Sequence, residues 1–256
     1  GDDTPGTVQR LCAKDRQPLR AELMRDLGIA DLPLATGAVC VYHALVPTAV
    51  SALVGTGIPV AAVSTGFPAG QSPFKTRLAE IEASVEAGAH EIDIVISRRH
   101  VLTSDWEALY EEVKAFRAAC GPAHLKAIIA TGELGAIDKV GKASMACMMA
   151  GADFIKTSTG KEPTNATLTG SLVMLRAIRA YHEETGYQVG FKPAGGIRTA
   201  KQALDWLMLM KEELGDEWLQ PHLFRLGASA LLNDIERQLE HFAYGRYASM
   251  QYQPLG

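Results

Sequence analysis

Residues 153–161 read Asp-Phe-Ile-Lys-Thr-Ser-Thr-Gly-Lys, an apolar run that ends in a lysine and continues into hydroxyls, a glycine and a second lysine. This order is typical of a strand followed by a polar loop large enough to hold a phosphate group. Lysine is depleted in strands and seldom fully buried, so packing does not explain Lys156. An amine in a dry pocket loses part of its preference for the charged form and can attack a carbonyl carbon to form a Schiff base. The alternative is a strand-end lysine whose ammonium group reaches solvent.

A second stretch favours the chemical interpretation of Lys156. Residues 189–198 read Val-Gly-Phe-Lys-Pro-Ala-Gly-Gly-Ile-Arg and repeat the same order: an apolar strand, a lysine at its end, then glycines and a cation. Two lysines at the ends of neighbouring strands would each lower the other's pKa. Lys156 and Lys192 are therefore a candidate catalytic pair.

The rest of the chain alternates short apolar runs with amphipathic stretches, which is the pattern of βαβ units. The predicted strands are residues 37–42, 60–66, 91–97, 125–131, 154–158, 188–192 and 224–227. The predicted helices are residues 46–55, 73–87, 105–119, 135–150, 168–185, 199–214 and 228–243, with residues 1–30 also helical. Strict alternation with no linker predicts one parallel sheet in a single domain over residues 1–256.

The predicted fold class is α/β, a (β/α)8 barrel. Seven strands do not close such a barrel, and the chain opens on a helix, so we expect its first strand to precede Gly1. The frame Ala-Gly-Ala-x-x-Ile-x occurs at residues 87–93 and 150–156, and superposing the two copies places Asp93 where Lys156 falls.

Strand alternation predicts which side chains enter the barrel. Ile92, Ile94 and Ile96 should face the helices, which turns Glu91, Asp93 and Val95 inward. The same parity places Cys40 and Lys126 inside as pocket-lining residues. Asp93 is thus a candidate catalytic carboxylate, and the alternative is a carboxylate paired with a cation for structural reasons.

A phosphate site can be predicted from the same fold. Barrels of this kind often hold phosphate in the loops after the last two strands, where backbone N–H groups converge. Glycine-containing loops follow three consecutive predicted strands, although a glycine pair alone would indicate only a tight turn. The candidate phosphate ligands are Gly160, Lys161, Gly195, Gly196, Arg198, Gly227 and Ser229, with Thr159 lining the pocket.

Composition excludes several other classes of function. The chain has 256 residues, 47% of them hydrophobic, and a net charge of −4 without a basic stripe, which argues against a nucleic-acid partner. The four cysteines are widely spaced, and neither a signal peptide nor a membrane-length apolar run is present, so a cytoplasmic enzyme without a membrane partner is expected. The seven histidines form no metal-binding pattern, so we expect no metal.

Residues 153–161 and 190–198 together resemble the deoxyribose-phosphate aldolase family. The resemblance extends to residues 38–42, 66–68, 91–93, 131–134 and 224–229, and residues 211–218 and 245–247 are similar to the longer, animal-type members. It implies a class I aldolase without metal or cofactor, which reversibly cleaves 2-deoxy-D-ribose 5-phosphate to acetaldehyde and D-glyceraldehyde 3-phosphate.

The resemblance also implies roles for the candidate residues. Lys156 would form the imine, Lys192 would hold Lys156 partly neutral, and Asp93 would relay protons. The implied partners are small phosphorylated sugars and aldehydes, with a possible homodimer. Two alternatives stay open: another Schiff-base carbon transferase, and a phosphosugar-binding barrel without catalytic activity.

Overall fold

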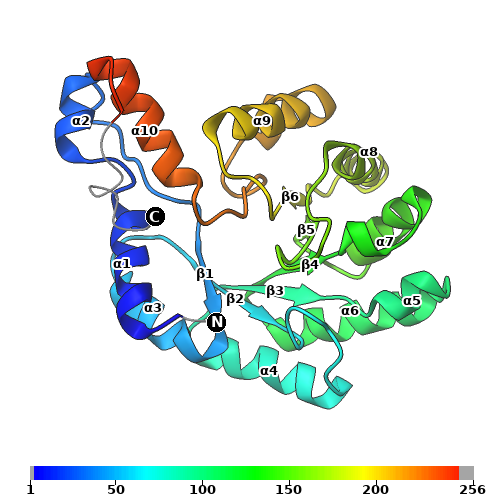
Figure 1. Ribbon diagram of the computed structural model, residues 1–256. Helices are drawn as coiled ribbons and strands as arrows, with labels where there is room; N and C mark the ends of the chain where they lie inside the picture. The colour runs from blue at the N-terminus through cyan, green and yellow to red at the C-terminus, as the bar shows by residue number, and fades with distance from the viewer. Residues whose placement is uncertain (1–2, 248–256) are drawn as a thin grey trace.

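The fold is built on one parallel sheet. A computed structural model describes residues 3–247 of the chain. Its strands are β1 (Val39–Tyr42), β2 (Val60–Ser64), β3 (Glu91–Val95), β4 (His124–Ile128), β5 (Phe154–Lys156) and β6 (Gly190–Lys192). Each strand pairs in parallel with the next, in the order β1-β2-β3-β4-β5-β6. Figure 1 shows the strands around the centre of the molecule with the helices outside them, the architecture of the predicted (β/α)8 barrel.

Helices alternate with the strands, as the sequence predicts. They are α1 (Pro5–Arg16), α2 (Ala21–Asp26), α3 (Val46–Ala52), α4 (Phe74–Glu86), α5 (Arg98–Leu102), α6 (Trp106–Cys120), α7 (Ile137–Met149), α8 (Leu168–Thr185), α9 (Ala200–Leu214) and α10 (Leu231–Tyr244). Short 3-10 helices occur at η1 (His43–Leu45), η2 (Thr131–Glu133) and η3 (Asp216–Trp218). Helix α5 was not predicted. Between residue 3 and β1 the structure contains α1 and α2 and no strand, so a strand before Gly1 stays a prediction.

The prediction of a strand at residues 224–227 is wrong, because this segment does not form a regular strand. This segment joins β6 only through two isolated parallel bridges, Phe191 with Phe224 and Ala194 with Gly227. The N–H of Arg225 donates to the carbonyl of Phe191, and the N–H of Gly227 donates to the carbonyl of Pro193. Proline has no N–H with which to donate in return, so the ladder is interrupted at Pro193.

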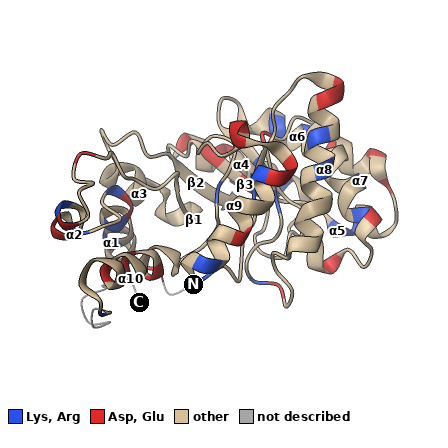
Figure 2. Ribbon diagram, turned by 90° about the horizontal axis from the view of Figure 1, so that it is seen from above, with Lys and Arg blue, Asp and Glu red and all other residues tan. Residues whose placement is uncertain are grey.

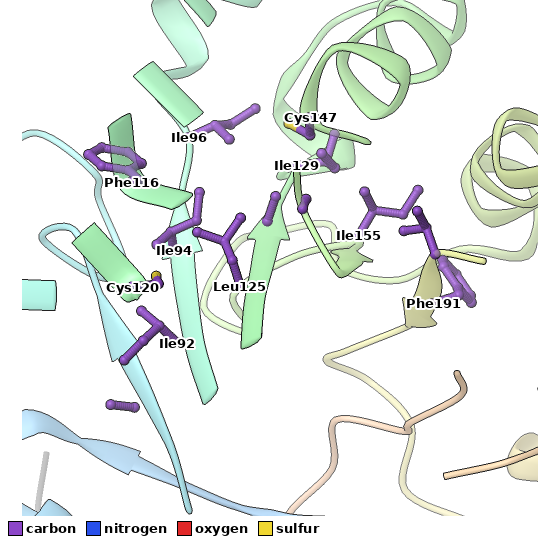
Figure 3. Packing of buried hydrophobic residues seen from close by; sticks show 14 of the residues in the cluster. Ile92, Ile94, Ile96, Phe116, Cys120, Leu125, Ile129, Cys147, Ile155 and Phe191 are labelled. Atoms are coloured by element: carbon purple, nitrogen blue, oxygen red, sulfur yellow. The ribbon is translucent and has the colours of Figure 1, made fainter. Parts of the chain in front are cut away.

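The apolar core lies between the strands and the helices. Ile92 and Ile94 of β3 and Ile96, just after the strand, are fully buried there and pack in one cluster with Phe116 and Cys120 of α6 (Figure 3). Glu91 and Asp93 lie on the opposite face of the strand, where they bind Lys126. The predicted alternation of β3 is therefore confirmed, and it turns polar side chains toward the barrel axis.

The first and last helices of the described region are joined by ion pairs. In α10, Glu236 binds Lys14 and Arg20, and Glu240 also binds Arg20. Figure 2 shows acidic segments of α10 beside basic segments of α1 and α2, and charges of both signs over the rest of the described chain. Among residues 3–247, no helix is long and apolar enough to cross a membrane.

Candidate active site

Asp93 lies at the centre of a buried cluster of charged side chains. Its Oδ1 accepts a hydrogen bond from Nζ of Lys126 at 2.8 Å. Its Oδ2 accepts one from Lys156 and one from Lys192, each at 2.8 Å. The exposed fractions are 0% for Asp93 and Lys126, 4% for Lys156 and 7% for Lys192. We call these four residues the lysine–aspartate cluster.

Strand register brings the cluster together. Asp93 of β3 lies opposite Lys126 of β4, and Lys156 of β5 lies opposite Lys192 of β6. Residues opposite each other in a parallel sheet point to the same face, so all four side chains enter the barrel. Lys156 and Lys192 are the last residues of their strands, which places both amines at the carboxyl-terminal end, where barrel active sites are found.

Burial and mutual attraction divide the protons unequally within the cluster. Burial alone would raise the pKa of Asp93, but the attraction of Lys126, Lys156 and Lys192 outweighs it and holds that pKa well below its usual range. For Lys156, burial and the like charge of Lys192 outweigh the attraction of Asp93 and lower the pKa. For Lys192, burial would lower the pKa, but the combined attraction of the surrounding negative groups, with Asp93 the largest, outweighs it and raises the pKa. Lys156 is thus the lysine that gives up its proton more easily.

Two further charged residues, to which the sequence analysis gave no role, continue the cluster. Glu91 accepts from Lys126 with Oε2 at 2.6 Å, and Arg225 lies 3.1 Å from Oε1 of Glu91. Strand alternation in the sequence predicted that Glu91 points inward. No pattern indicated its partner Arg225, which lies 134 residues later in the chain.

Cys40 lies at the margin of the cluster. Its Sγ is 3.9 Å from Oδ2 of Asp93, and the side chain is exposed, because β1 is an edge strand within the described part of the sheet. The predicted inward direction is confirmed by this contact. The other three cysteines are free and buried.

The loop after Lys156 is held in place by an acidic residue that the sequence analysis overlooked. The buried carboxylate of Glu162 accepts hydrogen bonds from the N–H groups of Thr159, Gly160 and Lys161 at 2.9 to 3.2 Å. The Thr159 hydroxyl donates to the same carboxylate at 2.6 Å. The Gly160 and Lys161 amides, expected at the phosphate, thus already have an anionic partner in the chain.

The predicted glycine loops converge beside the cluster. A Cβ on Gly160 would lie 3.8 Å from Cα of Gly195, and one on Gly227 would lie 3.4 Å from Cε of Lys192. Gly195 has φ of +83°, and a side chain there would collide with Asn165. The structure therefore brings Gly160, Gly195 and Gly227 to one end of the barrel.

The remaining candidate phosphate ligands are exposed around these loops. Gly196, Lys161, Arg198 and Ser229 are all solvent-accessible, and the backbone N–H of Arg198 donates to Gln202 at the start of α9. The side chains of Lys161, Arg198 and Ser229 are free to turn toward an incoming anion. Within residues 3–247, no group of three or more histidine, cysteine or acidic side chains is arranged to hold a metal ion.

A (β/α)8 barrel with two buried lysines on one carboxylate, at the carboxyl ends of its strands, defines an aldolase of the Schiff-base class. The chain matches the DeoC/LacD family of aldolases over residues 21–237, and it belongs to that family. The predicted resemblance is confirmed.

Relatives with curated names share most of the sequence. The chain is 62% identical to deoxyribose-phosphate aldolase of Mus musculus and 60% identical to that of Homo sapiens. Each alignment covers 100% of this chain and 81% of the relative.

Solved structures share the fold. The aldolase QR15 superposes with a TM-score of 0.69 at 25% identity, covering 94% of this chain and 92% of that one. The tetrameric deoxyribose phosphate aldolase of Aeropyrum pernix gives 0.66 at 21% identity, covering 96% and 87%.

Proposed function

We propose that this chain is a lyase that reversibly cleaves 2-deoxy-D-ribose 5-phosphate to acetaldehyde and D-glyceraldehyde 3-phosphate. Family membership over residues 21–237 and 60% to 62% identity to deoxyribose-phosphate aldolases support the reaction. One observation carries the chemistry: the buried Lys156, whose pKa is lowered, shares one oxygen of Asp93 with Lys192.

In the proposed reaction, Lys156 is the nucleophile. Its neutral amine attacks the C1 aldehyde of the open-chain sugar, and loss of water gives a protonated imine. The C3 hydroxyl gives up its proton, the C2–C3 bond breaks, and its electron pair moves toward the iminium nitrogen. Glyceraldehyde 3-phosphate leaves, and an enamine remains on Lys156. Protonation at C2 and hydrolysis then release acetaldehyde and restore the lysine.

Lys192 and Asp93 manage charge and protons around that amine. Lys192 keeps its proton, because Asp93 raises its pKa, and its positive charge helps to hold Lys156 neutral. Asp93 stays ionised and accepts hydrogen bonds from both lysines, so it can pass protons between them and a substrate oxygen or water.

The phosphate group would bind at the converging glycine loops. Gly195, Gly196 and Gly227 leave room for close approach, and Lys161, Arg198 and Ser229 can supply charge and a hydroxyl from the rim. The Gly160 and Lys161 amides can take part only if the Glu162 carboxylate moves aside.

We further infer a cytoplasmic enzyme that works without metal, cofactor, nucleic acid or membrane. Four free cysteines and a surface of mixed charge support this inference. Exposed Leu204, Leu207 and Met208 on α9 support a homodimer, which light scattering coupled to size exclusion would test.

Trapping the imine tests the proposed function. The protein is incubated with acetaldehyde and reduced with borohydride, and the modified peptide is mapped by mass spectrometry. An ethyl adduct on Lys156, absent in Lys156→Ala and retained in Lys161→Ala, is expected, together with acetaldehyde release from deoxyribose 5-phosphate. Adducts scattered over surface lysines, or phosphosugar binding without turnover, would refute the assignment.

A further inference from the structure

A series of alternating charges runs through the barrel and ends at the proposed proton relay. Arg225 lies 3.1 Å from Oε1 of Glu91, and Oε2 of Glu91 lies 2.6 Å from Nζ of Lys126. The same Nζ donates to Oδ1 of Asp93 at 2.8 Å. The side chains of Arg225 and Glu91 are only 13% and 5% exposed. Neither residue has a part in the chemistry proposed above.

Arg225 reaches Glu91 by crossing the barrel interior. Its backbone N–H binds the carbonyl of Phe191, which fixes the segment beside β6, whereas Glu91 begins β3 on the other side. The guanidinium carbon lies 5.8 Å from the ring centre of Phe154. A Cβ at Gly37 would lie 2.8 Å from Cδ of Arg225, so the glycine leaves the space through which the arginine passes.

Burying these charges lowers the stability of the fold, which suggests that they have a function. Each buried charge loses its hydration, and apolar side chains would fill the same space without that penalty. Lys126 is fully buried and contacts two carboxylates, and one of them, Asp93, also holds two other lysines. Glu91 therefore supplies the negative charge that Asp93 cannot give to Lys126 alone.

We propose that Glu91, itself held by Arg225, is a positioning residue that anchors Lys126 on Oδ1 of Asp93 and thereby leaves Oδ2 to Lys156 and Lys192. This inference rests on the proposed function, because positioning is measured through that reaction. Without Glu91, Lys126 would draw Asp93 away from the two catalytic amines.

The titratable groups that face the cluster come from several elements. Cys40 faces it from β1, Glu91 and Asp93 from β3, Lys126 from β4, Lys156 from β5, Lys192 from β6 and Arg225 from the segment after β6. Strand β2 contributes valine, alanine and serine and no charge. Glu91 is one of the groups that raise the pKa of Lys192, so its removal should move the alkaline limb of the pH–rate profile to lower pH.

Glu91→Gln tests the proposal, with Glu112→Gln as a matched control. Glu112 is also buried and pairs with Arg77 at 2.8 Å, but it lies on α6 in the outer layer. Both variants should lower Tm. Only Glu91→Gln should lower kcat, by roughly 10- to 100-fold with KM little changed, since small misplacements of reacting groups have effects of that size. Only Glu91→Gln should shift the alkaline limb.

If Glu91→Gln fails to fold, the double variant Glu91→Gln/Arg225→Met replaces it in the test. The double variant removes the guanidinium that would be left unpaired together with the carboxylate. Its Tm should be higher than that of Glu91→Gln, whereas its kcat should stay low and the alkaline limb of its pH–rate profile should stay shifted. A kcat and pH profile like those of Glu112→Gln, in the single or the double variant, would overturn the proposal. A wild-type protein with no imine adduct on Lys156 would instead refute the proposed function, so the two failures are distinguishable.

Discussion

Replacing Asp93 by asparagine removes the charge that holds three buried lysines. Asp93 is 0% exposed and accepts hydrogen bonds from Lys126, Lys156 and Lys192 at 2.8 Å each. An amide offers one oxygen acceptor, and its NH2 group would face an ammonium. We expect Asp93→Asn to be strongly destabilised and to lose aldolase activity.

The distances allow the size of the effect to be bounded. With an effective dielectric constant of about 20, two unit charges 2.8 Å apart attract by about 6 kcal/mol, so three pairs give a gross attraction of about 18 kcal/mol. The lysines can escape this loss by giving up a proton, which at pH 7 costs each about 5 kcal/mol. These opposing contributions nearly cancel, so we take the expected net loss from the general range for removing one partner of a buried ion pair, about 3–5 kcal/mol.

Urea unfolding followed by tryptophan fluorescence would measure this loss between pH 3 and pH 8. The pKa of folded Asp93 lies well below its unfolded value of about 3.9, so its contribution is fully present above that pH and is lost as pH falls below it. The difference between wild type and variant should be smaller at pH 3 than at pH 5, because part of the Asp93 contribution is lost at the lower pH.

A control for this measurement is Asp138→Asn. Its side chain is 64% exposed and pairs with Lys142 at 3.6 Å, so the change should cost less than about 0.5 kcal/mol. A loss below about 1 kcal/mol in Asp93→Asn at pH 7, or a loss that persists unchanged at pH 3, would refute the reasoning.

Three other changes test separate parts of the structure. Gly190→Ala would place a methyl group within 2.6 Å of ring atoms of Phe154. We expect the free energy of unfolding in urea to fall by about 1–3 kcal/mol, and the second change Phe154→Leu to restore part of it. An unchanged free energy of unfolding would show that the ring moves freely. Glu162→Ala leaves the loop amides without their acceptor, so inorganic phosphate should raise Tm more in the variant than in wild type, and an equal rise in both would contradict this. Burial raises the pKa of Asp15 to about 6, so the free energy of unfolding should fall as pH rises from 4 to 6. The variant Asp15→Asn should be more stable than wild type by up to about 3 kcal/mol at pH 7.5 and equally stable at pH 4. An equal gain in stability at both pH values would contradict this explanation.

Local patterns in the sequence were sufficient to predict the six regular strands of the sheet and the direction of the central side chains. Alternation along β3 separated Asp93 from Ile92 and Ile94, and the contacts of both faces agree with it. The two lysine motifs lay at the ends of neighbouring strands, so parallel pairing had to place Lys156 beside Lys192. Such features follow from strand geometry and need no knowledge of distant contacts.

Features that depend on contacts between distant segments could not be predicted in the same way. The strand expected at residues 224–227 was reduced to two bridges by Pro193 in its neighbour. Three consecutive N–H groups turn onto Glu162, although the sequence showed only a glycine loop of the kind that can hold phosphate. In both places a hydrogen-bond partner, and not a propensity, decided the conformation.

The sequence by itself determined that two lysines and one aspartate line a parallel barrel, because side-chain direction in a strand is set by residue parity. Only the tertiary structure shows the charges that make one of these lysines lose its proton more easily than the other. Lys156 and Lys192 share the same strand position and the same oxygen of Asp93, yet the pKa of one is lowered and that of the other is raised. The difference arises from burial and from the distances to all surrounding charges, including Glu91, and those distances exist only in the folded chain.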